Sequence, residues 1–235
     1  KIQPSGVWLL DAGIRYRIME GVTLETDVYY KPMKDLREYR PGVMVMAGFG
    51  LSWEELTVSG QGLNYGSEWM LELSSGRLTG WAGYSLSWAL RKFAGINNGR
   101  YFPYKFDRRH HLSMLANYLL RETSIRKSQL SCTFVYASGN AITIPDEQIP
   151  SVMLPGMTPD HPFADRFSRY LSFPHPNNYR MPAFHHLDLS WSLTRKLKRN
   201  RESTWHFSVY NLYNRLNPYF YYTSRDKFFQ ISMLP

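Results

Sequence analysis

Apolar and polar residues alternate along most of this chain, in runs longer than soluble strands usually are. In the run from Val7 to Ile18, Leu10 and Ile14 fall on one face and Asp11 on the other. A period of two residues predicts a β-strand with one apolar and one polar face. Each run lasts about 9–12 residues, the length of a tilted strand that crosses a bilayer, whereas soluble strands average about 5–6. We expect further strands of this kind at residues 22–30, 65–74, 82–91, 111–120, 129–136, 183–193 and 205–213, and a ninth that begins near Phe228.

The predicted connections between these runs alternate between short and long. Short connections fall at residues 19–21, 75–80, 121–127 and 195–203, long ones at 31–63, 93–110 and 139–182, and one of middling length at 214–227. Outer-membrane barrels are built with tight periplasmic turns and long extracellular loops. The sequence therefore predicts an all-β fold that is an antiparallel transmembrane β-barrel. A soluble sandwich has no reason to gather its long loops at one end.

Bulk composition agrees with that fold and excludes several others. Mean hydropathy is −0.40, and no stretch approaches the ~18 apolar residues of a spanning helix; a transmembrane strand has low average hydropathy because polar residues interrupt the apolar ones. The single cysteine, Cys132, excludes an internal disulfide. A net charge of +9 favours anionic partners: nucleic acid, lipopolysaccharide phosphates or an anionic cargo. The basic run at residues 195–201 lies in a predicted short turn without interleaved aromatics, so we expect no nucleic-acid partner.

The predicted number of strands bears on how much of a barrel this chain contains. Nine strands would place the two ends of the chain on opposite sides of the membrane, whereas bacterial single-chain barrels usually have an even number. Nine strands with open edges cannot satisfy their backbone groups in lipid. We therefore expect residues 1–235 to be the last part of a longer barrel, with its final strand cut short.

Three stretches resemble segments of TonB-dependent outer-membrane receptors of the Bacteroidetes type. Residues 99–112 place an aromatic-Pro pair before Asp-Arg-Arg-His at the start of a predicted strand. Residues 179–189 are similar to the start of a later strand in that family, and residues 208–222, with their Tyr-Asn and Asn-Pro features, are similar to its penultimate strand. Residues 63–68 also resemble the family's small-residue strand start.

The resemblance implies an active importer. The family's barrel has about 22 strands and a lumen filled by a plug domain, on which periplasmic TonB pulls. Cargo such as an iron chelate, cobalamin, an oligosaccharide or a peptide then passes through. On this interpretation residues 1–235 are the C-terminal part of the barrel in a Gram-negative outer membrane, and the plug and the closing strand lie outside this sequence. Outer-membrane lipid, lipopolysaccharide, TonB and, in some relatives, a surface lipoprotein that acts as a lid are the implied partners. No catalytic site and no cofactor are expected.

Candidate site residues fall into two groups. Arg100, Arg108 and Arg109 are candidates for gripping an anionic ligand or a lipopolysaccharide phosphate, because guanidinium forks bind such groups in pairs of hydrogen bonds. The alternative for Arg108 and Arg109 is a structural ion pair with Asp107 that fixes the base of a loop. Aromatic residues on the apolar faces of the runs are predicted to face the membrane and, near strand ends, to form aromatic girdles: Trp8, Tyr16, Tyr30, Trp69, Trp88, Tyr136, Trp191 and Trp205.

Histidines and carboxylates offer weaker candidates. The adjacent pairs at residues 110–111 and 185–186 point to opposite faces of a strand, so neither pair can chelate one metal alone. His161 and His175 with an acid such as Asp160 or Asp165 form a conceivable metal site, but interface and loop histidines are the favoured interpretation. Carboxylates on the polar strand faces, at Glu25, Asp27, Glu68, Glu72 and Asp188, are expected to contact the plug or water. Two other functions remain open: an outer-membrane barrel of another kind, such as a passive porin or a barrel enzyme, and a soluble all-β binding module.

Overall fold

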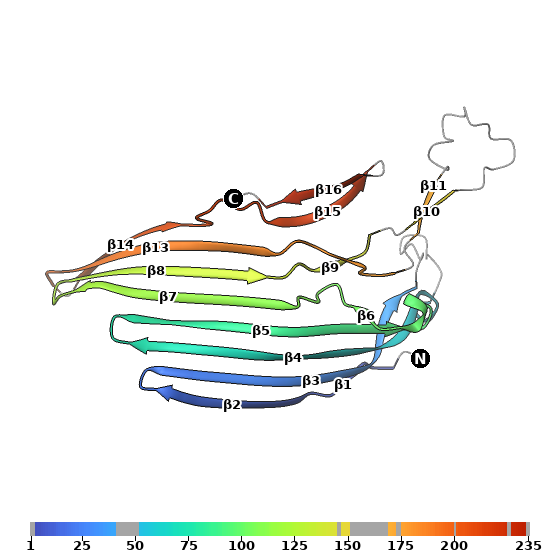
Figure 1. Cartoon of the computed structure of the whole chain (residues 1–235), viewed down its shortest axis with the longest axis horizontal. Coiled ribbons are helices and arrows are strands. Elements are labelled where there is room, and N and C mark those ends of the chain that lie inside the picture. The colour runs from blue at the N-terminus through green and yellow to red at the C-terminus, as the bar shows by residue number, and fades with distance from the viewer. Residues whose placement is uncertain are drawn as a thin grey trace.

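Eight long antiparallel strands follow one another across a single sheet, each hydrogen-bonded to its neighbours in sequence (Figure 1). The computed structural model describes residues 3–40, 52–144, 147–150, 169–172, 175–199, 201–224 and 227–233. The eight strands are β2 (Leu10–Met19), β3 (Val22–Tyr39), β4 (Thr57–Ser75), β5 (Leu78–Phe93), β7 (His110–Glu122), β8 (Arg126–Ala137), β13 (Phe184–Leu197) and β14 (Arg201–Val209). Two short strands, β1 (Gly6–Val7) and β6 (Phe102–Pro103), extend the sheet by pairing with β3 and β5. The fold is therefore all-β and antiparallel, as predicted.

Tight turns lie at one end of the sheet and the long connections at the other (Figure 1). The turns join β2 to β3, β4 to β5, β7 to β8 and β13 to β14. Gly21 in the first turn has a φ of +77°, and a Cβ there would lie 2.2 Å from the carbonyl oxygen of Ser74. Only glycine fits this position, because an L side chain would be strained and would collide with the next hairpin. The end with the long connections is called the loop end below, and the other the turn end.

Strand register gathers most of the apolar residues of all eight strands on one face of the sheet. Tyr30 lies opposite Tyr65, which lies opposite Trp88 on the next strand. Directly paired residues point to the same side of a sheet, so the apolar side of each strand lies on the same face as the apolar sides of its neighbours. We call this side the apolar face; it includes Leu10, Ile14, Leu24, Val28, Leu71, Leu86, Met114, Leu130, Leu189 and Phe207.

No second layer of described residues covers the apolar face. Ile14, Leu71, Met114 and Phe207 are all exposed on it, although they belong to four different strands. A compact globular monomer of 27.6 kDa exposes about 11,000 Å², whereas this chain exposes 17158 Å². The sheet therefore lacks the buried interior that a soluble sandwich would place between two layers.

Several strands are longer than the alternation predicted. β3 has 18 residues and β4 has 19, so the connection expected at residues 31–63 is wrong over both of its ends. A register shift between Met33 and Leu36 marks a bulge, and Asp35 there has a φ of 56°. A bulge inserts a residue and shifts the alternation, which is why a strict period of two stops near Tyr30. The basic run was also assigned wrongly to a turn, because residues 195–197 lie in β13 and Arg201 begins β14.

The last predicted strands differ most from the structure. β14 ends at Val209, so Tyr213 is outside it. The connection expected at residues 214–227 contains strand β15 (Pro218–Ser224), which pairs with β16 (Lys227–Ser232) in a separate hairpin. The ninth predicted strand is therefore paired with β15 and, among the described residues, not with the main sheet. The prediction that nine strands place the two ends of the chain on opposite sides of a membrane therefore loses its basis, because the main sheet contains eight consecutive long strands.

The only cluster of buried hydrophobic side chains among the described residues lies at the loop end. Phe93, Ile96 and Phe102 form it, with Leu36 and Val58 packed against them. Phe93 continues the side of β5 that carries Ser85, Ser87 and Arg91, so the cluster lies on the polar face, opposite the apolar face. A Cβ at Gly60 would lie 2.2 Å from the ring of Phe93. Gly60 therefore leaves the space that this ring fills.

The connections at the loop end contain short elements of their own. They include the one-turn helix α1 (Trp53–Leu56) and the 3-10 turn η1 (Asn97–Gly99), and two short strand pairs: β9 (Ala141–Ile142) with β12 (Tyr179–Arg180), and β10 (Glu147–Pro150) with β11 (Arg169–Ser172). Within the described ranges, no helix is long and apolar enough to span a membrane.

Candidate ligand-binding site

A buried aspartate organises the loop end of the sheet. The side chain of Asp107 is fully buried, and its carboxylate accepts hydrogen bonds from the backbone N–H of Ala89 at 2.7 Å, from Arg109 at 3.1 Å and from Arg180 at 2.5 Å. Arg180 also donates to the carbonyl oxygens of Asp107 and Gly139. These bonds join the connection after β6 to the connection before β13, so two long segments share one anchor.

The three candidate arginines occupy different environments. Arg109 is paired with Asp107, and its guanidinium carbon lies 4.7 Å from the centre of the Trp88 ring. Arg108 is exposed and donates from Nε to Asn140 at 2.6 Å. Arg100 is exposed at the end of η1. The geometry of Arg109 is that of the structural ion pair, while anion binding by Arg100 and Arg108 stays a prediction.

Buried asparagines fix the segment that follows β14. The side chain of Asn217 accepts a hydrogen bond from the N–H of His185 at 2.9 Å and donates to its carbonyl oxygen at 3.0 Å. The side chain of Asn211 accepts a hydrogen bond from the backbone N–H of Arg215 at 3.1 Å and donates to the carbonyl oxygen of Arg215 at 3.0 Å. The backbone N–H of Asn211 donates to the carboxylate of Asp188. Both asparagines are almost completely buried, at 4% and 5% exposure. Each side-chain amide therefore takes the place of a backbone hydrogen-bond partner for the residue that it binds.

Arg180, Asn211 and Asn217 were not predicted as structural partners. All three lie inside segments that the resemblance picked out, at residues 179–189 and 208–222. The signal was therefore present as a motif, but the distant partner of each residue could not be read from the chain.

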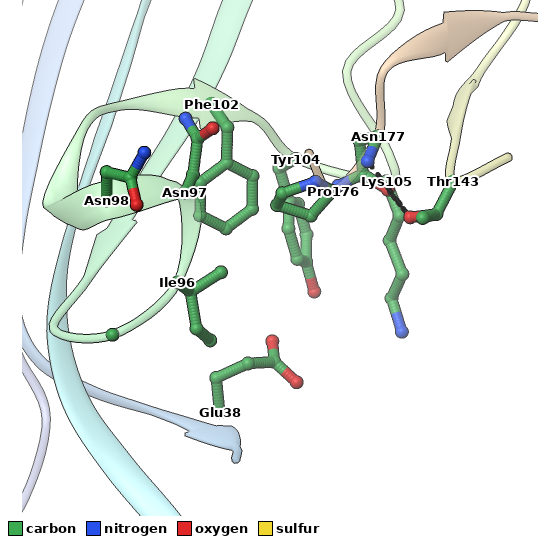
Figure 2. Close-up of a pocket in the computed structure, with 11 residues that line it drawn as sticks. Glu38, Ile96, Asn97, Asn98, Phe102, Tyr104, Lys105, Thr143, Pro176 and Asn177 are labelled. Atoms are coloured by element: carbon green, nitrogen blue, oxygen red, sulfur yellow. Dashed lines mark hydrogen bonds between the residues drawn. The ribbon is translucent and has the colours of Figure 1, made fainter. Parts of the chain in front are cut away.

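A cavity lies at the loop end. Its volume is 520 Å³, within the range of small-molecule sites. Figure 2 shows its lining, which comes from the end of β3, the connection between β5 and β7, and the segments around β9 and β12. The lining residues are Glu38, Gly95, Ile96, Asn97, Asn98, Phe102, Tyr104, Lys105, Thr143, Pro176 and Asn177. None of the predicted site residues belongs to this set.

Register places the cavity on the polar face. Glu38 lies opposite Val58, and Val58 packs against the buried cluster on that face. Tyr104 is fixed by Arg91, whose guanidinium carbon lies 4.2 Å from the centre of its ring and whose Nη1 donates to Asn64. Asn177 is fixed by bonds to Thr143 and to the carbonyl oxygen of Pro103. The walls are therefore largely preformed.

Two opposite charges reach the cavity from different elements. Glu38 comes from the end of β3, and Lys105 from the connection after β6 (Figure 2). Within the described part of the chain, neither of them forms an ion pair. Glu38 accepts one bond, from the N–H of Tyr39 at 3.3 Å, and the ammonium of Lys105 lies 5.2 Å from the centre of the Phe106 ring. Glu38 also interacts electrostatically with Arg91, which lies against the Tyr104 ring. The Glu38 carboxylate and the Lys105 ammonium still have hydrogen-bonding capacity that no described residue uses.

Three histidine rings, those of His110, His185 and His186, each form one side-chain hydrogen bond. His110 and His185 lie on the apolar face and bond the hydroxyls of Tyr84 and Tyr213, at 2.8 Å and 2.6 Å. His186 bonds Asp188 at 2.9 Å on the polar face. Among the described residues, no group of three or more His, Cys, Asp or Glu side chains could hold a metal ion. His161, Asp160 and Asp165 lie outside the described residues.

The predicted membrane-facing aromatics lie on or beside the apolar face. Trp69 stacks on Tyr84 and Trp88 on Tyr65, while Tyr136 packs on His185. Further along the same face, Trp191 stacks on Phe207, which also contacts Trp205. Trp8, Tyr16, Tyr30, Trp191 and Trp205 are exposed. Trp8 lies outside the strands, just after β1.

The polar face carries the carboxylates in the arrangement that the alternation predicted. Glu25 and Glu72 both approach Arg15, at 3.8 Å and 3.1 Å. Asp27 lies directly opposite Glu68. Exposed ion pairs of this kind add little stability. No protein-family model, curated protein or solved structure matches this chain.

Proposed function

We propose that this chain forms part of a transmembrane β-barrel in the outer membrane of a Gram-negative bacterium. The observation that carries the proposal is the exposed apolar face, which is continuous across eight strands and has no covering layer of described residues. Lipid is the environment that stabilises such a face, since each buried apolar Å² contributes about 25 cal/mol. The tight turns and the long connections lie at opposite ends of the sheet. This separation indicates how the barrel is oriented in the membrane, with the tight turns in the periplasm and the long loops outside the cell.

The edges of the sheet support a larger barrel. Among the described strands, β14 has one hydrogen-bonded neighbour, and β2 also has one. Unpaired strand edges are excluded from the hydrocarbon region. Further strands from the rest of the protein complete the barrel, which on the resemblance to TonB-dependent receptors has about 22 strands.

The barrel belongs to a TonB-dependent receptor that imports a nutrient. Support comes from the resemblance at residues 99–112, 179–189 and 208–222, and from the finding that these three segments supply the buried anchors of the loop end. The partners are TonB, reached through a plug outside this sequence, outer-membrane lipid, lipopolysaccharide, the cargo and, in the lidded type, a surface lipoprotein. Arg100 and Arg108 contact lipopolysaccharide phosphate or an anionic ligand, and the protein is not an enzyme.

A passive porin is the main alternative, because it shares the same sheet. The two differ in their need for energy: import through a TonB-dependent receptor stops when the proton-motive force is collapsed, whereas diffusion through a porin continues. A soluble all-β module is less well supported, because it would require another layer over the apolar face.

The test is to isolate the native protein and determine what it contains. Outer membranes are extracted with detergent, and the protein is examined by intact mass, peptide mapping and electrophoresis with and without boiling. A receptor has a mass far above 27.6 kDa, contains plug peptides and changes its migration on boiling. A protein found in the soluble fraction, with unchanged migration, contradicts the barrel; a barrel without plug peptides contradicts the receptor.

A further inference from the structure

We infer that the cavity at the loop end binds a zwitterionic ligand, specifically a short peptide with free termini. The inference rests on the proposed function and names the class of cargo that this site takes. It begins from the two charges in the lining, Glu38 and Lys105, which approach the cavity from different sides (Figure 2).

The signs of these two charges indicate which charged groups a ligand must carry. The half-buried carboxylate of Glu38 provides acceptors for an ammonium group, and the ammonium of Lys105 provides donors for a carboxylate. A neutral saccharide would displace water from both charges and neutralise neither, which is unfavourable. An anionic chelate would be attracted by Lys105 but repelled by Glu38. A zwitterion satisfies both.

The rest of the lining suits a peptide backbone. Asn98 and the hydroxyl of Tyr104 add donors and acceptors to the lining, and Phe102 and Ile96 provide an apolar wall. Peptide groups need such paired polar contacts, while side chains need apolar surface. The volume of 520 Å³ is large enough for a short peptide.

The position of the cavity connects it to import. It lies at the loop end and on the polar face, which faces the lumen when the apolar face is in lipid. A ligand held there stands at the mouth of the pore. The cavity is therefore a first binding site for cargo arriving from outside.

The test uses the full-length protein in detergent, with calorimetric titration of four probes: trialanine, N-acetyl-trialanine, trialanine amide and maltotriose. Trialanine is expected to bind, and removal of either terminal charge should weaken binding on the order of 10-fold, as expected for loss of one charge-assisted hydrogen bond. Maltotriose should not bind. Equal affinities for the charged and capped peptides, tight binding of maltotriose, or no binding of any peptide would each overturn the inference.

Two variants connect each terminus to its residue. Glu38→Gln should weaken trialanine on the order of 10-fold and leave N-acetyl-trialanine unchanged, because that probe has no ammonium group. Lys105→Met should weaken trialanine and leave trialanine amide unchanged. Glu202→Gln, in β14 at the turn end, is the matched control and should alter neither. If both site variants weaken all peptides equally, the assignment of termini is wrong.

Failure of this inference can be separated from failure of the proposed function. Migration with and without boiling is measured on the same samples, so it reports the barrel whether or not a peptide binds. A membrane-extracted protein that migrates differently after boiling but does not bind trialanine supports the barrel and contradicts the peptide site. A soluble protein that binds trialanine supports the peptide site and contradicts the barrel.

Discussion

Arg180 donates from Nη2 to Oδ2 of Asp107 at 2.5 Å, although the two residues are 73 positions apart in the chain. The pair joins the connection that follows β6 to the connection that precedes β13. Since Asp107 is fully buried, its charge depends on Arg180 and Arg109 for compensation. The loop end is thus stabilised by an interaction that exists only when distant segments meet.

Removing Arg180 should destabilise the loop end strongly. Arg180→Met leaves the buried carboxylate with Arg109 alone, and loss of one partner of a buried pair typically costs about 3–5 kcal/mol. We expect a loss of about 2–4 kcal/mol, because Arg109 still bonds Asp107. The free energy of unfolding in detergent, measured with guanidinium chloride, checks this. Arg108→Met serves as the control and should cost less than about 1 kcal/mol, since Arg108 is exposed; similar losses for both variants would contradict the anchor.

The two faces of the sheet should respond differently to charge. Leu24→Arg places a guanidinium on the apolar face, and near the middle of a bilayer this costs about 2–4 kcal/mol. Thr23→Arg places the same group on the polar face, where water is available, and should cost much less. Leu86→Arg and Phe207→Arg should behave as Leu24→Arg does, because register puts all three on one side. The measurement is folding free energy into phospholipid vesicles, and equal costs at Leu24 and Thr23 would exclude the lipid-facing assignment.

The segment after β14 should detach when its amide anchor is lost. Asn217→Leu leaves the N–H and the carbonyl oxygen of His185 without their partners, at a cost of about 1–3 kcal/mol for a buried unsatisfied group. Trypsin should then cut sooner at Arg215, which Asn211 and Asn217 hold in place. Tyr219→Phe is a suitable control, because Tyr219 is exposed. Cleavage of both proteins at the same rate would show that the asparagine does not hold the segment.

The turn at α1 should open in acid. The backbone N–H of Ser52 donates to the carboxylate of Glu55 at 2.7 Å, and this bond, followed by the one from the Ser52 hydroxyl, lowers the pKa of Glu55. A lowered pKa means that the ionised form stabilises the fold: the contribution is present above the ordinary glutamate pKa of about 4.3 and is lost as pH falls through the folded value. Hydrogen exchange in a peptide that spans residues 52–57 should therefore show less protection at low pH, after correction for the intrinsic rate. Glu55→Gln should remove this pH dependence; if it persists in Glu55→Gln, another group is responsible.

Much of the candidate site could not have been predicted from the chain. Alternation identified the strands and their faces because strand periodicity is local, depending only on residues two positions apart. It failed at the bulge near Asp35, where the period shifts, and at β15, where Pro218 and a run of aromatic residues hide the alternation. The resemblance marked the segments that carry Arg180 and Asn217 but named neither partner, and Glu38 and Lys105 were hidden in predicted loops.

The sequence alone determined which residues share a face over most of each strand, where three of the four tight turns fall and that the long connections gather at one end. These properties follow from spacing along the chain. Only the tertiary structure decided that the eight apolar stripes join into one face, that Asp107 meets Arg180, that Asn217 takes the backbone of His185, and that Glu38 and Lys105 reach the same cavity. Such pairings depend on strand register and on long connections that fold back over the sheet, and the energy of each exists only after both partners have been brought together.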